Sequence, residues 1–163
     1  MNLHPNIEPF AFLIGTWVGS GRGKYPTIND FEYRETVTFA STPGKPFLRY
    51  EQKTKSPDGA PMHTEVGFLR PVGDLVEFTI AQPTGQTELL EGTIKILEDG
   101  SLELLLDEGT VANTATAKPV DGTKRRYVFD ADRSKMTTEF EMEASGQAMQ
   151  NHLISELAIS NEV

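Results

Sequence analysis

Histidine is the residue type in this sequence best suited to bind a cofactor, because a neutral imidazole nitrogen can hold a metal ion or a haem iron. The chain has three histidines, His4, His63 and His152, and no cysteine. A zinc site needs three or four clustered ligands, whereas His63 and His152 lie far apart in sequence. A haem iron needs only one imidazole in a large apolar pocket. Haem therefore fits these histidines better than zinc does, and the alternative for each is a hydrogen-bonded structural role.

The other polar motifs predict little chemistry. Glu65 lies two residues after His63, so on a strand the two side chains share a face and could pair. Residues 19–23 have glycines spaced as in a phosphate-binding loop, but a second strand follows where such a loop needs a helix. No G-x-S-x-G motif of a serine hydrolase occurs. The lack of cysteine excludes disulfides, iron–sulfur clusters and thiol catalysis.

Small residues alternate near the start of the chain, where Gly15, Trp17, Gly19, Gly21 and Gly23 occupy every second position. This period places them on one face of a strand. Glycine weakens a strand and leaves no side chain to pack. Such a face is expected where something approaches the backbone closely or where the sheet bends sharply. A closed barrel with an internal ligand needs both.

The rest of the chain indicates an all-β fold. Apolar residues at 5–14 predict a short helix or turn that ends at Gly15. After it, turn signals rich in glycine, proline and aspartate separate short strands. The predicted strands are 17–25, 31–39, 47–54, 62–69, 75–81, 87–97, 102–106, 114–118, 125–129, 136–144 and 148–158. We predict one domain over 1–163, a closed antiparallel up-and-down barrel of about ten strands that resembles lipocalins and fatty-acid-binding proteins; a sandwich is the alternative.

Alternation within single strands predicts which side chains face inward. In 31–39 the inward face is mostly aromatic and apolar. In 136–144 it is apolar, while Glu139, Glu141 and Glu143 face water. Met62 and Met142 are expected to fill the core or to line a cavity. In 148–158 the periodicity is ambiguous and leaves the direction of His152 open.

Composition limits the partners of the protein. The chain has 163 residues and a formal net charge of −9. Nucleic acid and anionic membrane surfaces are therefore not expected as partners, because both attract basic faces. No stretch reaches transmembrane length and no secretory signal precedes residue 15, which predicts a cytoplasmic protein.

Several motifs together resemble the nitrobindin family, small β-barrel haem proteins, from about Gly15 to Leu157. They follow the family's order and spacing as Gly15-x-Trp17-x-Gly19-x-Gly21-x-Gly23-x-Tyr25-Pro26-Thr27, Phe31-x-Tyr33-x-Glu35, Pro46-Phe47-Leu48-x-Tyr50, Met62-His63-Thr64-Glu65-x-Gly67-Phe68-Leu69-Arg70, Glu91-Gly92, Thr116-Ala117-Lys118 and His152-Leu153-x-x-x-Leu157. The pattern departs from the family at Ile159, where a basic residue is usual.

The resemblance implies a ferric haem b, one per chain, with His152 as the proximal iron ligand turned into the barrel. It places Thr27 near the haem and Met62, His63 and Met142 on the pocket wall, with His63 not bound to iron. It also implies nitric oxide binding and the isomerisation of peroxynitrite to nitrate, with no catalytic residue beyond the haem iron.

Other functions remain open from the residues alone. The first is a carrier of a fatty acid or another apolar molecule, with Arg49, Arg70 or Arg126 as a candidate anchor for a carboxylate. The others are a haem-based nitric oxide sensor or store and a partner-binding domain with a vestigial cavity. The oligomeric state, a monomer or a homodimer, also stays open.

Overall fold

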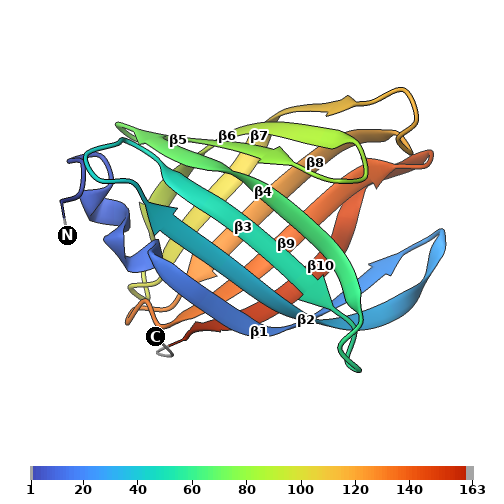
Figure 1. Cartoon of the computed structure of the whole chain (residues 1–163), viewed down its shortest axis with the longest axis horizontal. Helices are drawn as coiled ribbons and strands as arrows, with labels where there is room; N and C mark the ends of the chain where they lie inside the picture. The colour runs from blue at the N-terminus through green and yellow to red at the C-terminus, as the bar shows by residue number, and fades with distance from the viewer. Residues whose placement is uncertain (1, 161–163) are drawn as a thin grey trace.

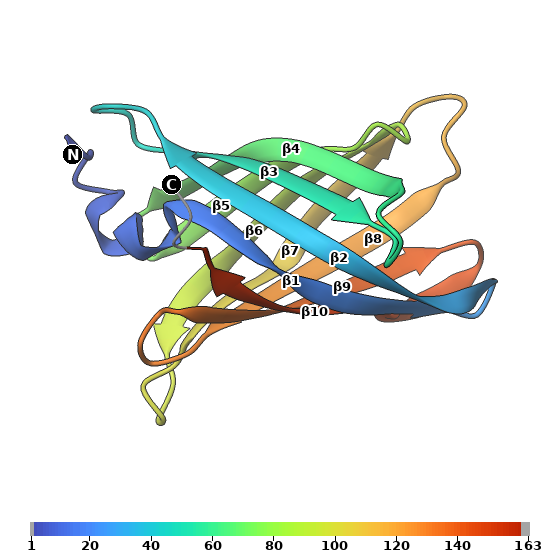
Figure 2. The same cartoon turned by 60° about the horizontal axis from the view of Figure 1, so that its bottom comes forward.

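The structure, a computed structural model that describes residues 2–160, is a closed barrel of ten antiparallel strands (Figures 1 and 2). A 3₁₀ helix, η1 (Glu8–Leu13), precedes them. The strands are β1 (Gly15–Tyr25), β2 (Ile28–Ser41), β3 (Leu48–Lys55), β4 (Pro61–Val72), β5 (Leu75–Ala81), β6 (Gln86–Ile96), β7 (Leu102–Asn113), β8 (Val120–Phe129), β9 (Lys135–Ala144) and β10 (Gln147–Ile159).

Each strand pairs with its neighbours in sequence, and β1 closes the barrel against β10. The closing register runs from Trp17 opposite Ile159 to Gly23 opposite Leu153. The predicted up-and-down barrel and its short N-terminal helix are confirmed. Ile159, which stands where the nitrobindin pattern usually has a basic residue, packs against the apolar core.

The predicted strand 114–118 is wrong. Strand β7 continues past the predicted end at residue 106 to Asn113, and the next residues form a turn before β8. The Asn113 side chain explains why β7 ends here. It donates a hydrogen bond to the Val120 carbonyl and accepts one from the Val120 amide, each at 2.9 Å. These two bonds occupy the backbone groups of Val120 and fold the segment between into a loop.

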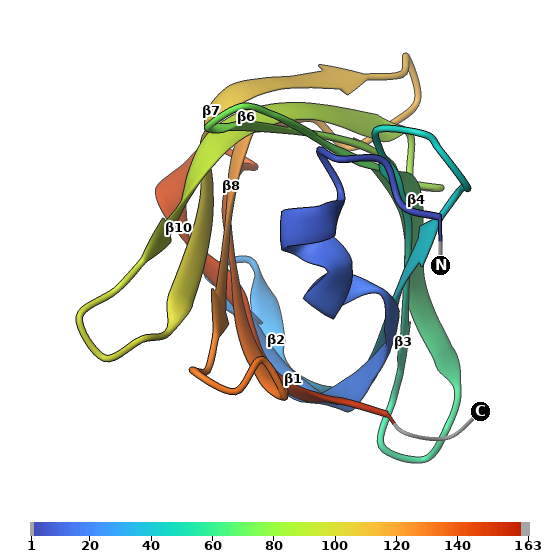
Figure 3. The same cartoon turned by 90° about the vertical axis from the view of Figure 1, so that its left-hand side faces the viewer.

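The helix η1 lies across one end of the barrel, as the end-on view shows (Figure 3). Ile7, Phe10 and Leu13 are buried there, and Trp17 Nε1 donates to the Leu13 carbonyl at 3.0 Å. The apolar core of the barrel continues from this helix over most strands. This end is therefore filled with side chains, so a ligand can be held only toward the other end.

The alternating glycines let other groups approach β1 closely. A Cβ atom on Gly19 would overlap the Glu156 carbonyl oxygen of β10. On Gly21 or Gly23 it would come closer than 3.0 Å to the ring of Tyr33 or Phe31, respectively, both on β2. Here the close approach is made by the protein's own strands and aromatic rings. In residues 2–160 no helix has the length and apolar character of a membrane span.

Candidate functional site

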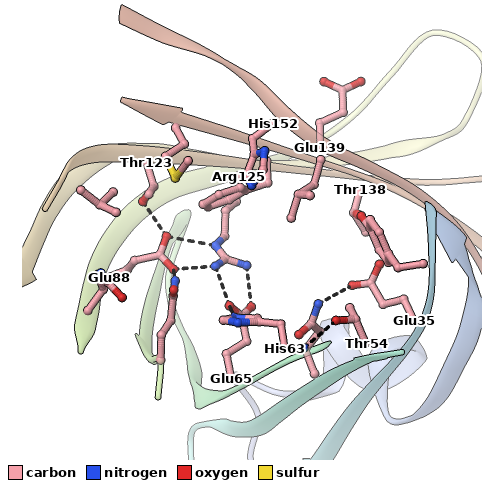
Figure 4. Close-up of a pocket in the computed structure, with 18 of the residues that line it drawn as sticks. Glu35, Thr54, His63, Glu65, Glu88, Thr123, Arg125, Thr138, Glu139 and His152 are labelled. Carbon is pink, nitrogen blue, oxygen red and sulfur yellow. Dashed lines mark hydrogen bonds and ion pairs between the residues drawn. The ribbon is translucent and has the colours of Figure 1, made fainter. Parts of the chain in front are cut away.

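A cavity of about 280 Å³ occupies the interior at the end away from η1 (Figure 4). Its walls come from eight of the strands, β2–β4 and β6–β10, together with Gln82 of the β5–β6 turn. The aromatic and apolar lining is Phe31, Tyr33, Tyr50, Met62, Val111, Val120, Tyr127, Phe140, Met142 and Leu153. The rest is polar and includes two histidines, one arginine and several carboxyl groups. The cavity thus combines flat apolar walls with a small set of ionisable side chains.

The side chain of His152 lines this cavity, and a β-bulge explains why. The β10–β9 register shifts between Asn151 and Leu153, so that His152 is an extra residue with no partner on β9. A bulge changes the direction of a side chain relative to strict alternation. As a result both His152 and Leu153 border the cavity, although they are neighbours in sequence.

One hydrogen bond sets the chemistry of the His152 ring. Its Nδ1 lies 3.0 Å from the backbone oxygen of Lys24. A carbonyl can only accept, so Nδ1 carries the proton and Nε2 keeps its lone pair. Burial lowers the pKa of His152 below its ordinary value, against a smaller rise due to the Lys24 carbonyl. The ring is therefore a neutral imidazole with Nε2 available as a ligand atom.

Three aromatic rings surround His152. Tyr25 lies at 5.3 Å between ring centroids, Phe140 at 6.1 Å and Phe31 at 6.2 Å. The Tyr25 hydroxyl also accepts from the Ala144 amide at 3.0 Å, which ties β1 to the end of β9. The imidazole is thus held by β1, β2 and β9 while its own strand is β10.

A buried ion cluster crosses the cavity floor, centred on Arg125 (Figure 4). Its guanidinium donates to both oxygens of Glu65 at 2.7 and 3.0 Å. It also donates to both oxygens of Glu88 at 2.5 and 3.1 Å. Two hydroxyl groups donate further hydrogen bonds to these carboxylates, Tyr50 to Glu65 and Thr123 to Glu88. This inward cation is therefore fully neutralised by the protein itself.

The arginines named earlier as carboxylate anchors do not serve as such. Arg49 is exposed on the outer wall. Arg70 pairs with Glu77, and Arg126 with Glu103, also on the outside. Sequence reasoning missed Arg125, although it alternates with Tyr127 and Phe129 in a strand whose inward face those aromatic residues mark. The same alternation places Arg126 outside.

The remaining predicted site residues are placed as follows. His63 lines the cavity, and its Nε2 lies 3.5 Å from Glu65, which confirms the pairing expected from their spacing. Met62 and Met142 also line the cavity, but Met62 is 45% exposed, so it lies at the rim and does not fill the core. Thr27 lies in the exposed turn between β1 and β2 and is not among the lining residues.

Glu35 is a third buried carboxyl group of the cavity, after Glu65 and Glu88, and has no cation bonded to it. Its Oε1 accepts from Gln52 Nε2 at 3.1 Å, but its Oε2 has no hydrogen-bond partner. Gln52 Oε1 likewise has none. Burial raises the pKa of Glu35, and the nearby Glu65 charge raises it further. Hydrogen bonds from Ser155 and Gln52 lower the pKa, but by less. The protein therefore favours the neutral acid at this position.

Glu35→Gln is expected to stabilise the protein as the pH rises. In the wild type the folded state holds a proton on Glu35 that the unfolded chain releases near pH 4.5, so stability falls as the pH rises through the folded pKa. The glutamine variant lacks this dependence. Thermal unfolding of both proteins from pH 5 to pH 8 should show a melting temperature difference that grows with pH. The control is Glu32→Gln, because Glu32 is an exposed residue on the same strand. If the melting temperature difference from the wild type does not change with pH for either variant, a neutral Glu35 is contradicted.

The side chains of the cavity that can bind a metal suit a flat cofactor that needs one axial ligand. His152 offers a single free imidazole nitrogen beside aromatic rings and a methionine side chain. Among residues 2–160, no group of three or more histidine, aspartate or glutamate side chains is arranged to hold a metal ion. The residues therefore fit an iron porphyrin, which brings its own four nitrogen ligands, better than a bare metal.

Comparisons with known proteins agree with this geometry. Residues 6–158 match the family model described as the THAP4-like, heme-binding beta-barrel domain. A protein named peroxynitrite isomerase 2 from Mycobacterium avium is 42% identical over 96% of each chain. One named peroxynitrite isomerase from Nocardia farcinica is 41% identical, over 95% of this chain and 91% of that protein. The crystal structure of Rv2717c from M. tuberculosis superposes with a TM-score of 0.90 at 40% identity, over 98% of this chain and 99% of that one.

Proposed function

The chain belongs to the family of THAP4-like haem-binding β-barrel domains, the nitrobindins, and from this premise we propose that it is a ferric haem b protein that isomerises peroxynitrite to nitrate. One haem is bound per chain, and His152 is its proximal ligand. Nitric oxide is a second ligand of the same iron. The protein acts in the cytoplasm, as a monomer or a homodimer.

The observation that carries this proposal is the hydrogen bond from His152 Nδ1 to the Lys24 carbonyl. In haem and metal sites such a bond fixes the tautomer and the orientation of the ligand imidazole. It leaves the Nε2 lone pair free to bind iron, and the lowered pKa of the half-buried ring favours the neutral imidazole at neutral pH. Met62 and Met142 then provide adaptable apolar contacts to the macrocycle.

When bound, the haem supplies the iron centre at which the O–O bond of peroxynitrite breaks and nitrate forms. The reaction is an isomerisation, so it consumes no proton and no electron from the protein. The chain's own residues would hold the cofactor. Phe31 and Phe140 contact the imidazole of His152 and so belong to the wall on the side of the iron ligand.

A fatty-acid carrier is the weaker alternative. Such a carrier needs an inward cation that is free to bind the carboxylate of its ligand. The inward cation here, Arg125, is bonded to Glu65 and Glu88 through four hydrogen bonds. Among the described residues that line the cavity there is no other arginine or lysine, so a carboxylate would meet no unpaired guanidinium or ammonium group.

Titration of the wild-type protein with ferric haem tests the proposal. We expect a saturable Soret band with a stoichiometry of one haem per chain. The loaded protein should accelerate the decay of peroxynitrite and raise the yield of nitrate, compared with the same concentration of haem-free protein. A Soret change that does not saturate would contradict haem binding, and saturable binding without faster decay would leave a haem protein that is not an isomerase.

A further inference from the structure

Two irregular points of the barrel meet beside the cavity. The β1–β2 register shifts at Lys24, and the β10–β9 register shifts at His152. Strands β1 and β10 are neighbours, so the two residues lie side by side. The hydrogen bond from His152 Nδ1 to the Lys24 carbonyl joins them. The orientation of the imidazole therefore depends on how β1 is shaped at this point.

Gly23, the residue before Lys24, has an aromatic ring in the place of a side chain. Phe31 stands directly opposite it in the β1–β2 register. A Cβ atom on Gly23 would come closer than 3.0 Å to three atoms of the Phe31 ring. On its other side Gly23 stands opposite Leu153, the residue after His152. The missing side chain thus lets a ring from β2 reach across β1 toward β10.

The ring that crosses Gly23 contacts the imidazole. The Phe31 centroid lies 6.2 Å from that of His152, with an angle of 67° between the planes, which is an edge-to-face arrangement. Tyr25 makes the same type of contact from β1 at 5.3 Å. The two rings restrict the rotation of the imidazole about its side-chain bonds, while the Lys24 carbonyl defines which nitrogen is protonated.

We propose that Gly23 and Phe31 are positioning residues for His152: the absent Cβ of Gly23 admits the Phe31 ring, and that ring holds the imidazole with Nδ1 on the Lys24 carbonyl and Nε2 free. The part of this inference that concerns haem rests on the proposed role of His152. The part that concerns the imidazole itself does not, because it describes the haem-free protein.

The first test uses haem-free protein and nitrogen NMR of its histidine rings. In the wild type we expect His152 as the Nδ1–H tautomer, because Nδ1 faces the Lys24 carbonyl. In Gly23→Ala the Phe31 ring must move, so the ring of His152 should show mixed tautomers. Gly21→Ala is the matched control, because its Cβ meets Tyr33 and Ser155 instead of Phe31 and should leave the tautomer of His152 unchanged.

A second variant separates positioning from a general loss of folding. Phe31→Leu in the Gly23→Ala background removes the ring that the new Cβ would meet. If steric contact with Phe31 is the cause, the double variant should fold better than Gly23→Ala and regain the single tautomer in part. If Gly23→Ala keeps the wild-type tautomer of His152, the proposal is overturned, whatever the protein does with haem.

Haem affinity is the third measurement. Changes in the groups that orient a metal-bound histidine typically reduce affinity by about 10–100-fold, and we expect a loss of this size for Gly23→Ala. Gly21→Ala should stay close to the wild type. Equal affinities for wild type and Gly23→Ala would overturn the part of the inference that concerns haem and leave the proposed function intact. Failure of the wild type to bind haem would overturn the proposed function, while the NMR experiment would still decide the positioning of His152.

Discussion

His152→Ala is expected to abolish specific haem binding and with it the isomerase activity. The imidazole is the one ligand that the proposal assigns to the iron, and its Nε2 is already unprotonated and turned to the cavity. Since changes to groups behind such a ligand cost about 10–100-fold in affinity, loss of the ligand itself should cost more than about 100-fold. A ferric haem titration followed at the Soret band measures this, and addition of free imidazole should restore part of the band.

His63→Ala is the matched control for this experiment. His63 lines the same cavity, but its Nε2 lies 3.5 Å from the buried Glu65 carboxylate. We therefore expect His63→Ala to keep the wild-type Soret position and stoichiometry. A band that is lost in His63→Ala and kept in His152→Ala would reassign the iron ligand. A band that neither substitution affects would mean that the haem is held without histidine.

Arg125→Met is expected to produce the largest loss of stability. The guanidinium is buried and is the only cation that contacts Glu65 and Glu88 in the described part of the chain, apart from His63 near Glu65 when protonated. Removing one partner of a buried ion pair leaves uncompensated charge and costs about 3–5 kcal/mol. For a chain of this length that lowers the melting temperature by roughly 6–20 °C. Calorimetry or thermal circular dichroism measures the change.

The pH dependence of that loss gives a second check. Burial raises the pKa of Glu65, but the Arg125 charge and hydrogen bonds from His63, Arg125 and Tyr50 outweigh it and lower the pKa to about 2. The ion pair of Glu65 with Arg125 therefore stabilises the folded state above pH 4.5, and this stabilisation is lost as the pH falls toward about 2. The gap in stability between wild type and Arg125→Met should narrow over this range.

Two further variants distinguish charge from packing. Arg126→Met on the outer wall removes a partly exposed cation and should cost less than about 1 kcal/mol. Adding Glu65→Gln and Glu88→Gln to Arg125→Met removes the stranded charges and should recover much of the stability. If this triple variant is as unstable as Arg125→Met alone, the Arg125 side chain matters for its shape and not for its charge.

The barrel was predictable because its signals are local. Alternation and turn residues recur at short range, and each strand can be recognised in isolation. The same local view failed at 114–118, where alternating residues lie in a turn that the Asn113 side chain closes. It also left Arg125 unrecognised, although Tyr127 and Phe129 marked its face, because a charged side chain inside a barrel becomes reasonable only when its partners are known. Those partners, Glu65 and Glu88, come from β4 and β6.

By itself the sequence determined the residue types that can bind a cofactor, the strand order of the barrel and, through its motifs, the resemblance to one family. Only the tertiary structure decided which way His152 faces and which atom of it is free. The physical reason is that both depend on contacts between strands distant in sequence. The bulge exists only in the pairing of β10 with β9, and the acceptor for Nδ1 is the carbonyl of Lys24, 128 residues away on β1. The alternation of residues within β10 carries no information about the bulge or about the Lys24 carbonyl.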